Sequence, residues 1–233
     1  MLIYLCQVQK IRITVKIMNI TKTTVYLVRH GESVGNLNKI CLGHTDLDLT
    51  PLGYLQAQKT AEKLKDIAFT AIYSSDLVRA MHTAEAHAVL RDVEVVGMSD
   101  FRELYFGDWE NSAVSWLTEN FYDMFMIGWR QNFGTFTAPS GESVTGMAKR
   151  MKEGILKIAR EHAGGTLLVA SHAAAIRALW GEISGINPIE WASAYPFPSN
   201  ASYSILEVCG MEMTPIAYSI DDHLSGMTTN IVG

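Results

Sequence analysis

The stretch VYLVRHGES, residues 25 to 33, runs from an apolar strand directly into arginine, histidine and glycine. A buried strand that ends in this way holds a rigid imidazole at the edge of a sheet, where the glycine lets backbone amides approach a ligand. Burying the guanidinium of Arg29 alone would be costly, so a purely structural role for it is disfavoured. The stretch therefore predicts a strand whose last residues, Arg29 and His30, belong to a functional site.

Three further apolar stretches, residues 69–75, 93–97 and 166–172, are predicted to form buried strands. Helical patterns alternate with them, and residues 203–210 and 212–219 indicate a closing hairpin that turns at Gly210. This alternation favours a largely parallel sheet covered by helices on both faces, a three-layer αβα sandwich. We therefore expect an α/β fold.

Two of the helices have clear start signals. One begins with Thr50 as N-cap and Pro51 as first helical residue, and the other spans Ser143 to His162 and stops before Gly164. The inner face of the first helix is expected to consist of Leu52, Leu55, Leu64 and Ile67.

Polar and charged residues gather where three of the predicted strands end. These ends are Arg29–Gly31, Ser74–Ser75 and Ser171–His172. Ligands of open parallel sheets bind outside the carboxyl ends of the strands. The three ends therefore predict one shared site.

The composition narrows the function class. A chain of 233 residues with 48% hydrophobic content fits one sizeable domain. The net charge is −5 and no Lys/Arg-rich run occurs, so neither nucleic acid nor a membrane surface is expected as a partner. The cysteines Cys6, Cys41 and Cys209 fit neither a disulfide framework nor a zinc site, which favours a reducing, cytoplasmic compartment.

Four ordered motifs carry a family resemblance. The stretches LVRHGES (27–33), SSDLVRAMHTA (74–84), FRELYFGDWE (101–110) and VASHAAAIRAL (169–179) together resemble the histidine phosphatase superfamily, also called the phosphoglycerate mutase-like family. The resemblance places the domain at residues 22–220, between an N-terminal extension (1–21) and a C-terminal tail (221–233). It also implies a helical lid, about residues 104–142, over the carboxyl ends of the strands.

The resemblance implies roles for six residues. His30 matches the nucleophile that forms a phosphohistidine, His172 the second histidine that stabilises the transferring group, and Glu103 the carboxyl group that protonates the leaving oxygen. Planar guanidinium groups suit phosphoryl oxygens. The phosphate-binding positions are matched by Arg29, Arg79 and Asn36. Because these groups supply the positive charge, no metal and no cofactor are expected.

Further residues are expected around the pocket. Ser33 and Gly43 would shape its first loop, His82 would border it, and Ala173 stands where the family usually has glycine, which costs little if the local φ is negative. Glu142 is interpreted with equal weight as a helix-start charge or as a site residue. Surface or packing roles are expected for His44, His82, His87, His162 and His223.

The predicted lid decides between phosphatase and mutase. Arg130 is the only basic residue from 103 to 148, whereas a mutase must also grip a carboxylate and a second phosphate. The lid is instead aromatic, and lid-to-body packing or substrate contact are both open for its rings. We expect a phosphatase that releases inorganic phosphate from a small phosphomonoester; phosphoglycerate mutase is the alternative, a non-catalytic phospho-ligand-binding protein is less favoured, and a homodimer is possible. The aromatic residues are Tyr105, Phe106, Trp109, Trp116, Phe121, Tyr122, Phe125, Trp129, Phe133 and Phe136.

Overall fold

The computed structural model describes residues 21–227, so predictions for residues 1–20 and 228–233 lie outside the described part of the chain. One sheet of six strands forms the centre, in the spatial order β3-β2-β4-β1-β5-β6. The first four strands in this order pair in parallel with their neighbours. Strand β5 pairs antiparallel with both β1 and β6. The strands are β1 (Lys22–Arg29), β2 (Ala71–Ser74), β3 (Val95–Gly97), β4 (Thr166–Ser171), β5 (Tyr203–Cys209) and β6 (Glu212–Ile220).

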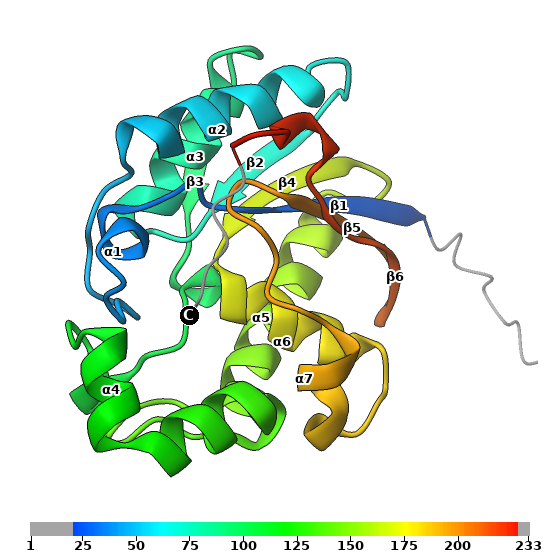
Figure 1. The fold of residues 1–233 in the computed structure, drawn as a ribbon. Helices are drawn as coiled ribbons and strands as arrows, with labels where there is room; N and C mark the ends of the chain where they lie inside the picture. The colour runs from blue at the N-terminus through cyan, green and yellow to red at the C-terminus, as the bar shows by residue number, and fades with distance from the viewer. Residues whose placement is uncertain (1–20, 228–233) are drawn as a thin grey trace, which may run out of the picture.

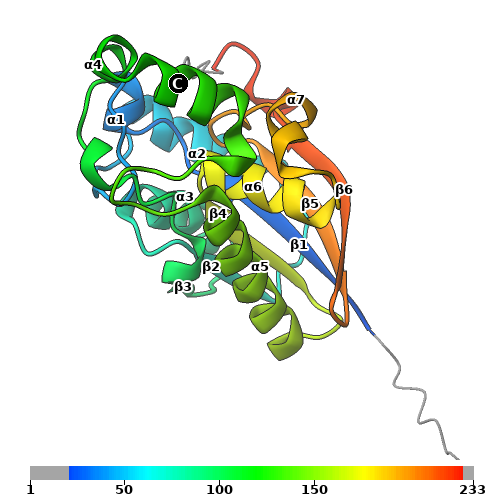
Figure 2. The same cartoon turned by 90° about the horizontal axis from the view of Figure 1, so that it is seen from below.

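Helices cover both faces of the sheet (Figure 1), which confirms the predicted three-layer αβα sandwich. Alternate residues of β4 show why: Leu168 and Ala170 pack on the side of α2 (Pro51–Lys63) and α3 (Val78–Ala88), while Leu167 and Val169 face the other side. That second side is covered by α5 (Val144–Glu161) and α6 (Ala173–Ile183), which lie side by side in Figure 2.

The segment between Glu103 and α5 forms the lid. It contains α4 (Val114–Asn120) and a π-helix (Asp123–Gln131), and it lies beyond the carboxyl ends of the parallel strands (Figures 1 and 2). Its rings pack mainly on one another: Trp109 contacts Phe121, Phe125 and Phe136 at centroid distances of 5.5 to 6.0 Å. Lid packing therefore accounts for much of the aromatic content.

The short elements are α1 (Val34–Leu37), α7 (Trp191–Ala194) and 3₁₀ turns at Ser99–Phe101, Gly107–Trp109, Phe133–Thr135, Pro188–Glu190 and Asp222–Leu224.

The predicted start signals and the hairpin are confirmed. The side chain of Thr50 accepts the backbone N–H of Gly53 at 3.1 Å, and Pro51 is the first residue of α2. The side chain of Ser143 caps α5 in the same way, and β5 and β6 turn at Gly210 with φ 65°.

The prediction for the inner face of α2 is wrong at Leu55, which is 43% exposed. The helix instead turns small and polar residues inward because it lies against the loop after β1. A Cβ on Gly53 would stand 2.0 Å from the carbonyl oxygen of Glu32, so no larger side chain fits there. The buried face consists of Gly53, Gln56, Ala57, Thr60 and Ala61, with Leu64 following the helix.

The strand predicted at residues 93–97 is present, but the prediction that it is buried is wrong. The strand is shorter, Val95–Gly97, and it is the outermost strand beside β2, with Val96 49% exposed. An edge strand pairs on one side only, so its side chains are less covered than those of β2 or β4.

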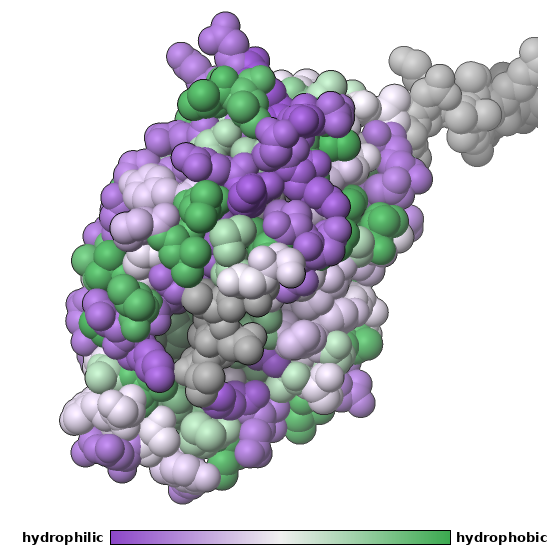
Figure 3. Space-filling view, turned by 45° about the horizontal axis from the view of Figure 1, so that its top comes forward, coloured by the Kyte–Doolittle hydropathy of each residue, from purple (hydrophilic) through white to green (hydrophobic). Residues whose placement is uncertain are grey.

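Hydrophilic and hydrophobic side chains share the face of the molecule that Figure 3 shows. In Figure 3, hydrophilic side chains cover much of the upper part of the visible face, and hydrophobic ones form small separate patches. Within residues 21–227, no helix combines the length and the apolar character that a membrane crossing requires.

Candidate active site

The polar and charged residues at the ends of β1, β2 and β4 lie close together. These strands are neighbours in the sheet, and Arg29 pairs with Ser171 while Ser74 pairs with Ala170. As a result the rings of His30 and His172, which are far apart in sequence, lie 5.1 Å apart between centroids. The prediction that these strand ends share one place is confirmed.

His30 is held in one orientation with one ring nitrogen occupied. Its Nδ1 lies 2.7 Å from the carbonyl oxygen of Gly31, and because a carbonyl only accepts, Nδ1 carries the hydrogen. The lone pair is therefore on Nε2. Burial, followed by the charges of Arg79 and Arg29, lowers the pKa of His30 well below 6.5. The ring is neutral near pH 7, and its Nε2 is a competent nucleophile.

Two buried guanidinium groups flank this imidazole. Arg29 donates from Nη1 to the carbonyl of Pro198 at 2.6 Å, and Arg79 donates to the carbonyls of Thr45 and Gly43 at 2.9 and 2.8 Å. Burial lowers the pKa of Arg29 to about 9 and that of Arg79 to about 10, so both stay charged near pH 7. Two buried cations beside a neutral imidazole form a site for an anion.

His172 lies beside His30, has no exposed surface and is not among the residues that line the cavity at this site. Its Nε2 is 2.8 Å from the hydroxyl of Ser75, at the end of β2, and its Nδ1 has no hydrogen-bond partner within residues 21–227. Burial, and then the charges of Arg79 and His30, lower its pKa well below 6.5. The ring is therefore a neutral hydrogen-bonding group rather than an imidazolium.

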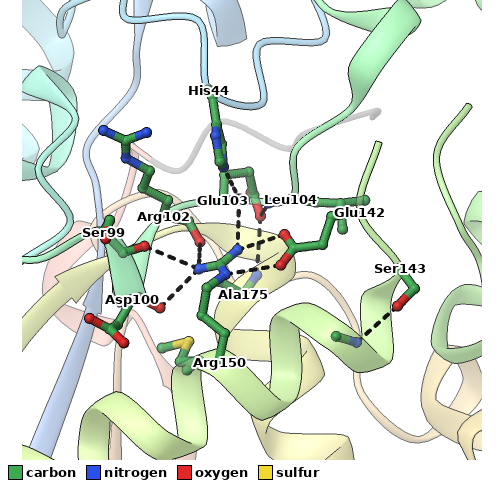
Figure 4. Close-up of polar contacts among 12 residues, drawn as sticks. His44, Ser99, Asp100, Arg102, Glu103, Leu104, Glu142, Ser143, Arg150 and Ala175 are labelled. Atoms are coloured by element: carbon green, nitrogen blue, oxygen red, sulfur yellow. Dashed lines mark hydrogen bonds and ion pairs between the residues drawn. The ribbon is translucent and has the colours of Figure 1, made fainter. Parts of the chain in front are cut away.

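Glu103 reaches the site from the segment that enters the lid. Its carboxylate accepts the backbone N–H groups of Leu104 at 2.9 Å and of Ala174 and Ala175, both at 3.2 Å, at the start of α6. Its own carbonyl accepts from Nε2 of His44 at 2.9 Å. The side chain thus lies against the N-terminus of α6, close to the strand end that carries His172 (Figure 4).

A cavity of about 160 Å³ connects these residues with the lid. Its polar wall includes Asn36, whose Oδ1 accepts from the backbone of Ser33 at 3.1 Å and from Asn200 at 3.1 Å. The cavity is lined by the predicted residues Arg29, His30, Ser33, Asn36, Gly43, Arg79, Glu103 and Ala173, and also by Glu32, Gly35, Lys39, Ile40, Cys41, Leu42, Phe106, Val114, Phe125, Trp129, Ala174 and Phe197.

The expectations for His82 and Glu142 need correction, and the condition set for Ala173 is met. His82 does not line the cavity: it faces the surface, with Nδ1 2.7 Å from both Asp48 and the Tyr54 hydroxyl. Glu142 neither caps α5 nor lines the cavity, because its carboxylate pairs with Arg150. Ala173 is the first residue of α6 and its φ is not positive, so alanine fits where the family usually has glycine.

Sequence reasoning missed several residues of the site. Ser75 was placed at the shared site as the end of a predicted strand, but its contact with His172 was not predicted. Asn200 donates to the carbonyl of His30 at 3.2 Å as well as to Asn36. Lys39 and Phe197 line the cavity without any motif that points to them. Between residues 21 and 227, no three His, Cys, Asp or Glu side chains gather in a way that would hold a metal ion.

Comparison with known proteins identifies the family of this chain. The model of the histidine phosphatase superfamily (branch 1) matches residues 25–220. The chain belongs to this superfamily. In sequence it is 33% identical over 204 residues to a Bacillus subtilis protein named Uncharacterized phosphatase PhoE, covering 88% of this chain and 98% of that one.

Another relative of this superfamily member has a mutase name, and a solved structure shares its fold. It is 34% identical over 166 residues to the Probable phosphoglycerate mutase GpmB of Photorhabdus laumondii, covering 70% of this chain and 75% of that one. The solved structure of Bacillus stearothermophilus YhfR matches with a TM-score of 0.81 at 26% identity, covering 87% of this chain and 99% of that one. The superfamily is thus established, with both phosphatase and mutase names among the relatives.

Proposed function

We propose that this histidine phosphatase superfamily member hydrolyses phosphomonoesters of small molecules through a phosphohistidine at His30, without a metal ion. The observation that carries the proposal is the bond from His30 Nδ1 to the Gly31 carbonyl, which leaves Nε2 as the only ring nitrogen with a lone pair. Because burial keeps the ring neutral, that lone pair is available near pH 7.

The first step moves the phosphoryl group to the enzyme. Nε2 of His30 attacks phosphorus, the bond to the leaving oxygen breaks, and Glu103 in its protonated form gives that oxygen its proton. The guanidinium groups of Arg29 and Arg79 hold the equatorial oxygens, where the transition state carries its charge. His172 does not line the cavity; with its Nε2 accepting from Ser75, its unpartnered Nδ1 is the atom that donates to these oxygens once they are bound.

The second step restores the enzyme. Glu103, now a carboxylate, takes a proton from water, and the resulting hydroxide attacks the phosphohistidine. The bond from phosphorus to Nε2 breaks, the electron pair returns to the ring, and inorganic phosphate leaves. The arginines serve both steps because the phosphoryl oxygens stay in place while the attacking and leaving atoms exchange.

The other half of the cavity bears on the substrate. The lining includes the aromatic residues Phe106, Phe125, Trp129 and Phe197 and no basic residue of the lid. An apolar wall favours a leaving group that is itself apolar or uncharged. This supports phosphatase over mutase for the chain, in line with the phosphatase name of the Bacillus subtilis relative.

Phosphoglycerate mutase remains a second candidate because of Lys39. Lys39 lies outside the lid, and it lines the cavity from the loop after α1. A lysine at that place suits a carboxylate or a second phosphate. The mutase name of the Photorhabdus laumondii relative adds weight to the same candidate.

The test is phosphate release from a panel of phosphomonoesters in the presence of a chelator, beside a coupled assay for interconversion of 3- and 2-phosphoglycerate. We expect release by the wild-type chain and at least about 10³-fold less by His30→Ala, because without a nucleophile the two-step route is closed. His162→Ala, a histidine at the end of α5 outside the cavity, is the matched control and should keep its activity.

Each other outcome has a distinct meaning. Fast isomerisation with little release would make the chain a mutase. Residual release close to wild type in His30→Ala would contradict the nucleophile assignment. A folded chain that binds phosphate but has neither activity would be a phospho-ligand-binding protein.

A further inference from the structure

Arg150 on α5 lies outside the cavity but contacts the segment that carries Glu103 (Figure 4). Its Nη2 donates to the carbonyl of Glu103 at 3.2 Å, and its Nη1 donates to the carbonyls of Asp100 at 2.9 Å and Arg102 at 3.0 Å, with Ser99 further away at 3.4 Å. One guanidinium therefore holds the turn Ser99–Phe101 and the two residues after it. This is the stretch through which the chain enters the lid.

The orientation of Arg150 is set by Glu142, where the chain leaves the lid. The two side chains form a bidentate pair, with Nη2 to Oε2 at 2.7 Å and Nε to Oε1 at 3.0 Å, and each is 23% exposed. The carbonyl and amide of Glu142 are also bound, to the amide of Ala138 and the carbonyl of Tyr105. Arg150 and Glu142 thus tie both ends of the lid to α5.

Glu103 is held from two directions. Its carbonyl accepts from Arg150 on α5 and from His44 in the loop after β1, while its carboxylate lies against the first N–H groups of α6. A carbonyl is one bond away from the Cα that bears the side chain. Where these donors hold the backbone therefore decides where the carboxyl group reaches into the cavity.

We propose that Arg150, oriented by Glu142, is a positioning residue for the proton donor Glu103. The inference rests on the proposed phosphatase function. Arg150 does not touch the cavity, so its contact with the reacting groups runs through Glu103, while its charge also lowers the pKa of His172. A displaced carboxyl group loses its hydrogen-bond distance to the leaving oxygen, while the nucleophile and the arginines of the phosphate site stay in place.

This role has a signature that general loosening of the fold lacks. An alkyl phosphate expels a basic alkoxide and depends on the proton from Glu103, whereas an aryl phosphate with an acidic phenol leaves readily without it. General acid catalysis contributes about 10²- to 10⁴-fold, so mispositioning the acid should remove part of that factor for the alkyl ester only.

The experiment compares kcat/KM for an alkyl phosphate and for 4-nitrophenyl phosphate in wild type, Arg150→Gln, Arg150→Lys and Glu142→Gln. We expect Arg150→Gln to lower the ratio of alkyl to aryl activity by about tenfold or more, and Glu142→Gln to lower it less, since the guanidinium keeps its carbonyl partners. Arg150→Lys keeps the charge but loses the fork, so its ratio should lie between. Lys152→Gln, which breaks another ion pair of α5 with Glu182 at 3.0 Å, is the control and should leave the ratio unchanged.

A double variant tests the path of the effect. If Arg150 acts through Glu103, adding Arg150→Gln to Glu103→Gln changes the ratio no further. Equal loss on both esters in Arg150→Gln and Arg150→Lys, or a further fall of the ratio in the double variant, would overturn the inference while the phosphatase function stands. Absence of phosphate release in the wild-type chain would overturn both.

Discussion

Acid should destabilise this protein through His87, and the size of the effect follows from the structure. His87 lies on α3 without exposed surface, and neither ring nitrogen has a hydrogen-bond partner among the described residues. Burial, followed by the charges of Arg91 and His223, lowers its pKa to about 3. In an unfolded chain histidine titrates near about 6.5.

The sign of the effect follows from which state binds the proton. Below about pH 6.5 the unfolded chain takes up a proton at His87 that the folded chain does not, so the free energy of unfolding falls as the pH falls. At about 1.36 kcal/mol for each pH unit, the loss from about pH 7.5 to about pH 5 is about 2 kcal/mol for this one residue. His30 and His172 are also held neutral by burial and add losses in the same direction.

Two variants isolate the contribution of His87. Urea unfolding is measured at both pH values for wild type, His87→Leu and His87→Gln. Both variants should lack about 2 kcal/mol of the acid loss of wild type, because neither replacement titrates. At about pH 7.5 His87→Leu should be the more stable of the two, since an unpaired buried polar group costs about 1–3 kcal/mol. An acid loss in His87→Leu equal to that of wild type would refute the reasoning.

Two further predictions concern the loop after β1. Gly31→Ala should lower the free energy of unfolding, measured in urea, by about 1–3 kcal/mol, because its Cβ would stand 2.3 Å from the carbonyl oxygen of Gly53. Gly97→Ala is the control and should change this free energy little, because the nearest contact of its Cβ is at 3.4 Å. Similar losses in the two variants would contradict the prediction. Lys39→Gln should lower kcat/KM for 3-phosphoglycerate about tenfold more than kcat/KM for an aryl phosphate, since a charge-assisted contact is worth about 1.5–3 kcal/mol. Equal effects on the two substrates would show that Lys39 does not contact a second anionic group.

Local patterns were sufficient for most elements of the fold. The apolar run into Arg29, the cap Thr50 before Pro51, the cap Ser143 and the turn at Gly210 all depend on residues a few positions apart, and the structure has each of them. Alternation of strands and helices was likewise enough for the three layers. The motifs also pointed to Arg29, His30, Arg79 and Glu103 of the cavity lining, whereas no motif pointed to Lys39 or Phe197.

Burial on a given face was decided by tertiary structure. Leu55 is exposed because the loop after β1 comes so close to α2 that only a small residue such as Gly53 fits between them. Val96 is exposed because the order of strands puts β3 at the edge. Neither the close contact at Gly53 nor the edge position of β3 can be recognised in the local sequence, because each depends on segments that are distant along the chain.

The same distinction holds within the site. Sequence by itself determined that His30 and Arg29 end one strand and that His172 ends another, because a strand and the residue after it are adjacent in the chain. Only the tertiary structure decided which nitrogen of His30 is free, that Ser75 meets His172, and that Glu142 turns to Arg150. The His30 bond reaches only the carbonyl of the next residue. The pairs Ser75–His172 and Glu142–Arg150 are contacts between side chains of different segments, and they exist only once the sheet, α5 and the lid have packed.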